Sequence, residues 1–239
     1  MKIFYIAFSG RAAQVTDRPF SVIITPMNEV KKSNPLPLPT IRRYPIYLRA
    51  IKAKIAGGDL TVSSAVLAEE LGLDPVLTRK DLAMTGVSGK PRRGYPAKEL
   101  CDAINRALGW DNDIDAALVG VGSLGHALLG YHGFEDQNLR IVVAFDVNPS
   151  VVGTVHHGVR VRGMDEMAKF IPRLKVMLGI LTVPNDAAQS CADQLVAAGI
   201  RGIWNFTAIQ LDVPKEVKVQ HVDLAASLAV LSHSIAANA

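Results

Sequence analysis

The chain has little cysteine and no long apolar run, and both shortages narrow the classes of protein to which it can belong. Cys101 and Cys191 are its two cysteines, and neither lies in a CxxC or Cys/His spacing. We therefore interpret both as buried free thiols in a reducing compartment, with a redox pair as the less favoured alternative. No metal site is expected. No apolar stretch approaches the roughly 20 residues that a membrane-spanning helix needs.

The first 40 residues also lack a clear signature. Lys2 and the apolar run Ile3 to Phe8 faintly resemble a signal peptide, but the run is short and Arg11 comes soon after it. We interpret residues 1–40 as a poorly ordered N-terminal extension. The remaining chain is predicted to divide into residues 41–109, residues 110–222 and a final segment, residues 223–239.

Charge is divided unevenly between these parts. Residues 41–109 carry 12 Lys and Arg against 7 Asp and Glu, whereas residues 110–239 carry 9 against 13. A basic block joined to an acidic one indicates that the basic part contacts a polyanion such as nucleic acid.

The basic block reads as four helices and one turn-rich hairpin. Ser63 or Ser64 is placed to cap a short helix with Val66 facing inward, and Gly72 is placed to end it. Asp74 and Pro75 then open another helix. Two short helices so connected predict a helix-turn-helix, whose second helix lies in the major groove of DNA.

The DNA-facing side chains are predicted from this interpretation. The second helix is expected to display Thr78, Arg79 and Lys80, and residues 89–94 resemble a basic wing. The wing would place its cations, Lys90, Arg92 and Arg93, against phosphates or in a minor groove. The alternative is a small helical cap domain whose charges only face solvent.

A glycine-rich turn is the most informative motif in the acidic block. Gly120, Gly122 and Gly125 follow the apolar run at residues 116–119 and open a helical pattern, and Asp146 ends the next apolar run. In a dinucleotide-binding fold the first glycine permits a sharp turn, the second lets backbone approach a pyrophosphate, and the third lets helix pack on strand. Asp146 comes 21 residues after Gly125, and an acid at this spacing accepts hydrogen bonds from the adenosine ribose hydroxyls, which favours NAD(H) over NADP(H). A glycine turn without a ligand is the alternative.

The rest of the acidic block continues the alternation of strand and helix. It predicts an α/β fold, a doubly wound parallel sheet. Ligands bind beyond the carboxyl ends of such strands, so residues 182–184 and 205–206 should flank the nicotinamide. The apolar helix expected over residues 225–237 should dock against another surface.

At this point the chain resembles a known family, the redox-sensing transcriptional repressors Rex, over residues 41 to 236. The motifs that carry the resemblance are Tyr47-Leu48-Arg49, Arg79-Lys80-Asp81-Leu82, residues 117–125, Tyr131-His132-Gly133-Phe134, Phe145-Asp146-Val147, residues 181–184, Ala198-Gly199-Ile200, Asn205-Phe206 and Val222-Asp223-Leu224.

The resemblance implies a winged helix, a Rossmann domain and an exchanged C-terminal helix in a cytoplasmic homodimer. Such a dimer binds a pseudo-palindromic DNA operator when NADH is low and is released by NADH, without enzymatic activity. Tyr131, near the nicotinamide, would pair with Asp223 in one state, and Arg49 would contact Asp223 in the other. The resemblance also implies the set of cofactor contacts, which comprises Gly120, Gly122, Ser123, Leu124, Gly125, Tyr131, Asp146, Val147, Thr182, Val183, Pro184, Asn205, Phe206 and Asp223.

Some positions depart from the family. The wing reads Lys90-Pro91-Arg92-Arg93, and Thr207 stands where alanine is usual, which leaves the operator sequence open. Two other functions also stay open at this point. One is an NAD-dependent dehydrogenase, although no histidine has an evident acidic partner in the sequence. The other is a cofactor-binding regulator that acts without DNA.

Overall fold

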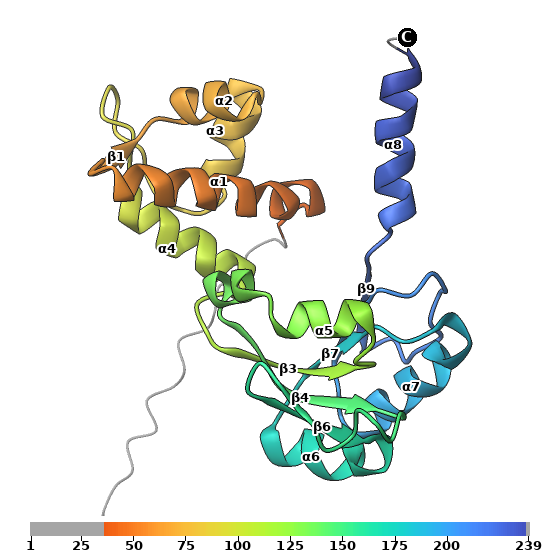
Figure 1. Ribbon diagram of the computed structural model, residues 1–239. Helices are drawn as coiled ribbons and strands as arrows, with labels where there is room; N and C mark the ends of the chain where they lie inside the picture. The colour runs from red at the N-terminus through yellow and green to blue at the C-terminus, as the bar shows by residue number, and fades with distance from the viewer. Residues whose placement is uncertain (1–35, 238–239) are drawn as a thin grey trace, which may run out of the picture. The chain divides into compact units, whose positions relative to one another are not determined.

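The computed structural model describes residues 36–237, in which a helical region, residues 37–109, precedes a sheet region, residues 110–223 (Figure 1). Most of the extension expected over residues 1–40 lies outside the described residues. Where the two overlap, helix α1 begins at Leu38, so the expected boundary at residue 40 is wrong. The reason is that Pro39 is tolerated in the first helical turn, where an N–H has no intrahelical partner.

The helical region contains the predicted helix-turn-helix. Ser63 accepts a hydrogen bond from the Ala65 N–H and caps α2, and Asp74 caps α3 in the same way through the Leu77 N–H. Gly72 ends α2 in the left-handed conformation, at φ +62°. The elements are α1 Leu38–Ala56, β1 Thr61–Val62, α2 Ser64–Leu71, α3 Pro75–Ala83, β2 Tyr95–Pro96 and α4 Ala97–Leu108.

A small hairpin forms the wing. Strands β1 and β2 pair antiparallel, and a bridge between Lys90 and Gly94 closes the basic loop ahead of β2. Val66, which was expected to face inward from α2, is exposed instead, and Leu67 and Ala68 are the α2 residues that are buried. Leu67 and Leu71 were also expected to face inward; Leu67 is fully buried and Leu71 is half-buried, so the expectation is wrong only for Val66.

The sheet region has the strand order of a dinucleotide-binding fold. The order is β5-β6-β4-β3-β7-β8-β9, and all neighbouring pairs are parallel except β5 with β6. Apart from the edge strand β5, this is the doubly wound arrangement, whose order reverses between β3 and β7. The strands are β3 Ile114–Val119, β4 Leu139–Asp146, β5 Val155–His156, β6 Val159–Gly163, β7 Leu178–Leu181, β8 Gly202–Asn205 and β9 Lys218–His221.

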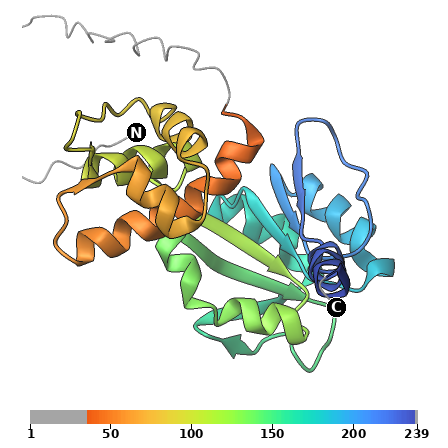
Figure 2. The same ribbon diagram turned by 90° about the horizontal axis from the view of Figure 1, so that it is seen from above.

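Helices cover both faces of this sheet, as Figures 1 and 2 show. One apolar cluster joins the strands to α6 and α7, and a second joins them to α5 and the segment η1. Gly130 ends α5, and His132 begins η1. The helical elements are α5 Ser123–Leu129, η1 His132–Gln137, η2 Met164–Glu166, α6 Met167–Leu174, α7 Asn185–Ala197 and α8 Leu224–Ala237.

Candidate dinucleotide site and nucleic-acid interface

The glycine turn has the geometry that its sequence predicts. Gly120 has φ +93°, and a Cβ there would lie 2.7 Å from the Thr182 carbonyl oxygen. A Cβ on Gly125 would collide with the Gly120 carbonyl, so α5 can pack this closely on β3 only with glycine. A Cβ on Gly122, in contrast, would meet nothing within 4 Å, and this leaves the backbone open to a ligand. The backbone thus shows the sharp turn expected of Gly120 and the close helix packing expected of Gly125, and it is open at Gly122.

Asp146 lies at the end of β4, next to this turn. Its carboxylate accepts hydrogen bonds from the Val121 N–H at 2.6 Å and from the Asn148 N–H at 2.8 Å. A carboxylate offers about four lone-pair sites, so two remain for hydroxyl donors. Asp146 thus holds the turn in place and still presents acceptor capacity to the adjoining pocket.

A pocket of about 310 Å³ joins the turn to the end of β7. Gly120, Gly122, Asp146, Val147 and residues 182–184 all line it, so the structure brings together predicted residues from three strand ends. The Thr182 hydroxyl points toward the glycine turn, where it donates a hydrogen bond to the Gly120 carbonyl oxygen at 2.7 Å. The buried Cys191, which the sequence did not single out for this site, also lines the pocket, and burial raises the pKa of its thiol.

Two predicted contacts, Ser123 and Leu124, are exposed at the start of α5 and do not line the pocket. Two others lie past the end of β8. Asn205 is fully buried, and its amide nitrogen bonds with the Ile209 carbonyl and the His221 ring. Its amide oxygen accepts twice from Thr207.

The hydrogen-bonding capacity of the Asn205 amide is therefore used inside the protein, and its predicted place beside the nicotinamide stays a prediction. Phe206 and Asp223 line a separate pocket of about 270 Å³, where Asp223 also caps α8 through the Ala226 N–H.

The three residues expected to form a switch are only partly brought together. Arg49 from α1 and Tyr131 line one pocket of about 150 Å³, whereas Asp223 lies in the pocket with Phe206. Tyr131 is 58% exposed. Ring contacts connect it to the other pocket, in the order Tyr131 to Phe134 at 4.9 Å, Phe134 to Trp204 at 5.8 Å and Trp204 to Phe206 at 5.0 Å between centroids.

The predicted DNA-reading helix α3 presents two cations to the surface. Arg79 and Lys80 are exposed, but Thr78 is fully buried, so the expectation that α3 displays Thr78 is wrong. Neighbouring helical residues point about 100° apart, and Thr78 lies on the face that packs inward with Asp81. Arg79 and Lys80 are consequently the outward part of the motif.

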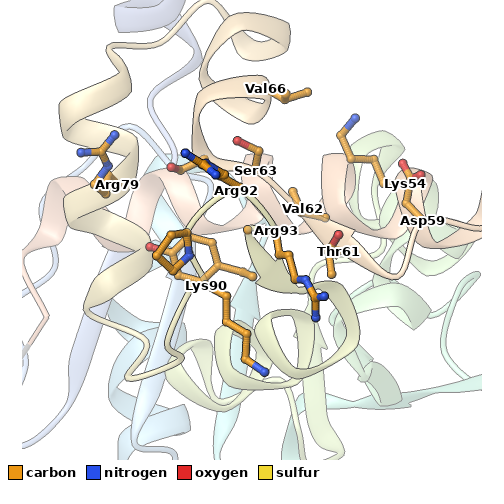
Figure 3. A pocket seen from close by; sticks show the side chains of 15 residues that line it. Lys54, Asp59, Thr61, Val62, Ser63, Val66, Arg79, Lys90, Arg92 and Arg93 are labelled. Carbon is orange, nitrogen blue, oxygen red and sulfur yellow. The ribbon is translucent and has the colours of Figure 1, made fainter.

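A basic groove of about 680 Å³ lies between α3 and the wing (Figure 3). Arg79 lines it together with Lys54 and the three wing cations Lys90, Arg92 and Arg93. Figure 3 shows these labelled side chains, which come from α1, α3 and the wing. Lys80 lies outside its lining. Such a concentration of cations suits phosphate groups on adjacent nucleotides.

A buried hydrogen-bond network connects α3 to α1. In the sequence, Asp81 stood out only as part of a family motif, and this network was not predicted. Asp81 is 1% exposed and accepts hydrogen bonds from Arg43, Tyr47 and Thr40. Burial alone would raise the pKa of Asp81, but these hydrogen bonds outweigh it and hold that pKa below the ordinary value. The signal was present only as polar residues on the inward side of α1, 34 to 41 positions earlier.

Family models match both regions. Residues 111–209 match the family described as "CoA binding domain", and residues 35–83 match "Putative DNA-binding protein N-terminus". Curated relatives carry the name "Redox-sensing transcriptional repressor Rex", including one from Treponema denticola and one from Bacteroides fragilis. The chain is 45% identical to the one from Treponema denticola over 81% of this chain and 92% of the relative. For the one from Bacteroides fragilis, the identity is 41% over 84% of this chain and 91% of the relative.

Solved structures give the same result. RSP, a Rex-family repressor, is 34% identical with a TM-score of 0.76, covering 84% of this chain and 93% of that one. RSP in complex with NAD⁺ and operator DNA is 35% identical with a TM-score of 0.79, covering 84% and 92%. RSP in complex with NADH is 34% identical with a TM-score of 0.75, covering 84% and 94%.

A winged helix-turn-helix with a basic groove, followed by a Rossmann sheet with an open glycine turn, defines a transcriptional regulator with a dinucleotide-type pocket. The similarity extends over most of both regions rather than over the sheet alone. The chain belongs to the Rex family of redox-sensing transcriptional repressors. No helix within residues 36–237 has the length and apolar character to cross a membrane.

Proposed function

We propose that this chain is a redox-sensing repressor of the bacterial cytoplasm that binds operator DNA when NADH is low and leaves it when NADH is bound. The observation that carries this is the open glycine turn with Asp146 on the same chain as the basic groove. The Rex-family protein RSP has been solved with NADH and with NAD⁺ and operator DNA, which supports both ligands here.

The residues present fit a dinucleotide. The turn has room for a pyrophosphate at Gly122, and the pocket beside it is mainly apolar apart from the Asp146 carboxylate. Asp146 would bind the adenosine ribose, and Gly122 would let the backbone approach the phosphates. The nicotinamide, when bound, supplies a ring that is cationic in NAD⁺ and neutral in NADH. The protein then has to prefer a different arrangement for each form, because a ligand shifts an equilibrium only by its differential affinity.

Helix α8 supports a homodimer. It carries no Asp, Glu, Lys or Arg, and its large apolar side chains are exposed at Leu228, Val230, Leu231 and Ile235. An apolar helix face of this kind marks a protein interaction site. Exchange of α8 with a second copy would cover this face. Two copies would also place two reading helices on a pseudo-palindromic operator.

Asp223 precedes α8 directly, so an exchanged α8 would bring Asp223 to the partner's sheet region. There it would alternate between Tyr131 and Arg49, which already line one pocket in this chain. The ring contacts from Tyr131 to Phe206 give this pocket a packed connection to the strand end beside Asp223. Arg49 is on α1 of the helical region, so its partner would bias the orientation of the DNA-reading surface.

A gel-shift experiment on an A·T-rich palindrome, with NADH and NAD⁺ added separately, tests the function. We expect a shifted protein–DNA complex that dissociates when NADH is added and persists when NAD⁺ is added. Asp223→Ala should still bind NADH but lose most of its release from DNA. An unchanged ratio of operator affinities with and without NADH would reject this coupling. Absence of DNA binding, or turnover of NADH with a substrate, would favour a DNA-independent regulator or a dehydrogenase.

A further inference from the structure

Asp81 lies on the side of α3 that faces α1, opposite to the cations of the basic groove. Its Oδ1 accepts from the Thr40 hydroxyl and from Arg43 Nη2, both at 2.9 Å. Its Oδ2 accepts from Arg43 Nε at 2.6 Å and from the Tyr47 hydroxyl at 2.8 Å. Each oxygen thus has two donors, and the carboxylate has no acceptor capacity left for DNA.

The backbone at this point is held as well. The Tyr44 hydroxyl donates to the Asp81 carbonyl oxygen at 3.1 Å, so α1 supplies these five hydrogen bonds to Asp81, four to its carboxylate and one to its backbone. Tyr44 and Tyr47 are both fully buried, and burial raises the pKa of both phenols, that of Tyr44 to about 12. The phenols therefore stay protonated and remain donors at neutral pH.

These contacts fix the rotation of α3 about its own axis. Thr78 and Asp81, three residues apart, share the inward face, while Arg79 and Lys80 between them point outward. A helix whose inward face can rotate would carry both cations to new positions. A buried ion pair with all of its hydrogen bonds satisfied tolerates little such rotation, because a displaced charge would be left without partners.

The same helix α1 continues to the groups near the sheet region. Arg49 follows Tyr47 by two residues, and Lys52 Nζ lies 3.4 Å from the Asp136 carbonyl oxygen on η1. One end of α1 therefore holds the reading helix, and later turns of the same helix carry Arg49 and Lys52. A displacement of α1 at Arg49 is passed to Arg79 and Lys80 only if α3 is fastened to α1.

We propose that Asp81 is a positioning residue that makes α1 and α3 move as one body, so that operator reading and its release by NADH both depend on it. This rests on the proposed function. Asp81 touches neither DNA nor cofactor. It acts through Arg79 and Lys80, because its contacts on the inward face of α3 set the direction in which these two side chains point.

The test uses the full-length chain with Asp81→Asn, which keeps the size of the side chain but removes the charge and places an NH₂ group against donors. We expect the ratio of operator affinity to non-specific DNA affinity to fall at least about tenfold, within the range that specific complexes span. The factor by which saturating NADH weakens operator binding should fall by about threefold or more, since the two helices no longer move together. NADH affinity itself should be unchanged.

The matched control is Glu70→Gln, which breaks the exposed pair of Glu70 with Lys54 between α2 and α1. It should shift operator and non-specific binding alike and leave both ratios unchanged. A side chain that only stabilised the fold would weaken the DNA complex by the same factor with and without NADH, and that result for Asp81→Asn overturns the proposal.

If Asp81→Asn does not fold, variants of two of its hydrogen-bond donors test the proposal. Tyr47→Phe and Arg43→Gln each remove donors to Asp81, and the proposal requires both to lower both ratios. Combined with Asp81→Asn in a folded protein, neither should add its full effect, because the pair acts as one unit. A wild-type chain that ignores the operator or NADH contradicts the proposed function. If the wild type binds the operator and is released by NADH, and the variants keep both ratios, only the role of Asp81 is contradicted.

Discussion

The helical region and the sheet region are held together by different means. Within residues 36–237 the buried charged side chain is Asp81 in the helical region, and Thr40 and Thr78 are buried beside it on the same helix pair. The buried polar side chains of the sheet region, Asn205 and Thr207, are neutral and bond to each other. Its strands are otherwise joined to helices through two large apolar clusters.

The difference matches what each region has to do. Apolar packing is nondirectional, so it stabilises the sheet, while the glycine geometry and the hydrogen bonds from Val121 to Asp146 and from Thr182 to Gly120 shape the cofactor turn. A buried ion pair contributes little net stability, but its geometry is directional, and in the helical region it fixes which side of α3 faces outward. Perturbations of the two regions should therefore fail in different ways.

The largest effect is expected at the glycine turn. Gly125→Ala puts a Cβ against the Gly120 carbonyl, and overpacking of this kind costs about 1–3 kcal/mol. Because the strain moves α5 away from β3, we expect NADH affinity to fall by about 100-fold, which corresponds to the upper end of that range. Calorimetry with NADH measures it, and operator binding without NADH should be retained.

Gly122→Ala is the matched control for this substitution. Gly122 has φ −73°, and a Cβ there meets nothing within 4 Å, so the thermal unfolding midpoint should not change. NADH should still bind more weakly, because the methyl group occupies the approach of the pyrophosphate. Full NADH affinity in Gly125→Ala would contradict the role assigned to this turn.

The next effect separates the two kinds of cation in the basic groove. Arg79→Ala should lose about 1–3 kcal/mol of discrimination between operator and mismatched DNA, as expected for a side chain that reads a base. Arg93→Ala, on the wing, should weaken all sequences alike and flatten the salt dependence of binding. Fluorescence anisotropy titrations at several salt concentrations distinguish these outcomes. If both variants show the same discrimination and the same salt dependence, the two side chains do not have different roles.

A smaller effect concerns the choice of cofactor. Asp146 is followed by Val147, Asn148 and Pro149, none of which offers a cation to a 2′-phosphate. Its carboxylate should repel that group, so NADH should bind more tightly than NADPH by about 1–2 kcal/mol. Competitive titration of the two reduced cofactors gives the difference. Equal affinities would place the ribose away from Asp146.

The smallest effect should appear in acid. Burial raises the pKa of Asp81, but the hydrogen bonds from Arg43, Tyr47 and Thr40 outweigh it, so the folded pKa lies below the ordinary value. The stabilisation is therefore complete above the unfolded pKa of about 4 and is lost as pH falls through the folded pKa. Urea unfolding between neutral pH and acid should show a decline in the free energy of unfolding that Asp81→Asn reduces. An identical slope in both proteins would mean that the pKa of Asp81 does not differ between the folded and unfolded states, which contradicts this prediction.

Local signals in the sequence predicted much of this molecule. The caps Ser63 and Asp74, the stop at Gly72 and the glycine turn each depend on backbone chemistry within a few residues, and the structure confirms them. The doubly wound parallel sheet was also predicted from the sequence, because the alternation of apolar strands and helices admits few topologies.

The features that the sequence could not predict depend on contacts between distant segments. The sequence of the short α3 did not reveal that Thr78 faces inward, because the polar residues Thr78 and Asp81 are buried there together with Leu82. The partners of Asp81 lie on another helix, and those of Asn205 lie on a loop and a neighbouring strand. A side chain that looks available for a ligand in sequence can have all of its hydrogen bonds satisfied in the fold.

The exposed apolar face of α8 has a consequence for the cofactor ratio to which the protein responds. If a sensing site is completed only by a second copy, its free energy includes an association term that depends on concentration. The cofactor ratio at which half of the operators are free would then shift with the number of repressor molecules.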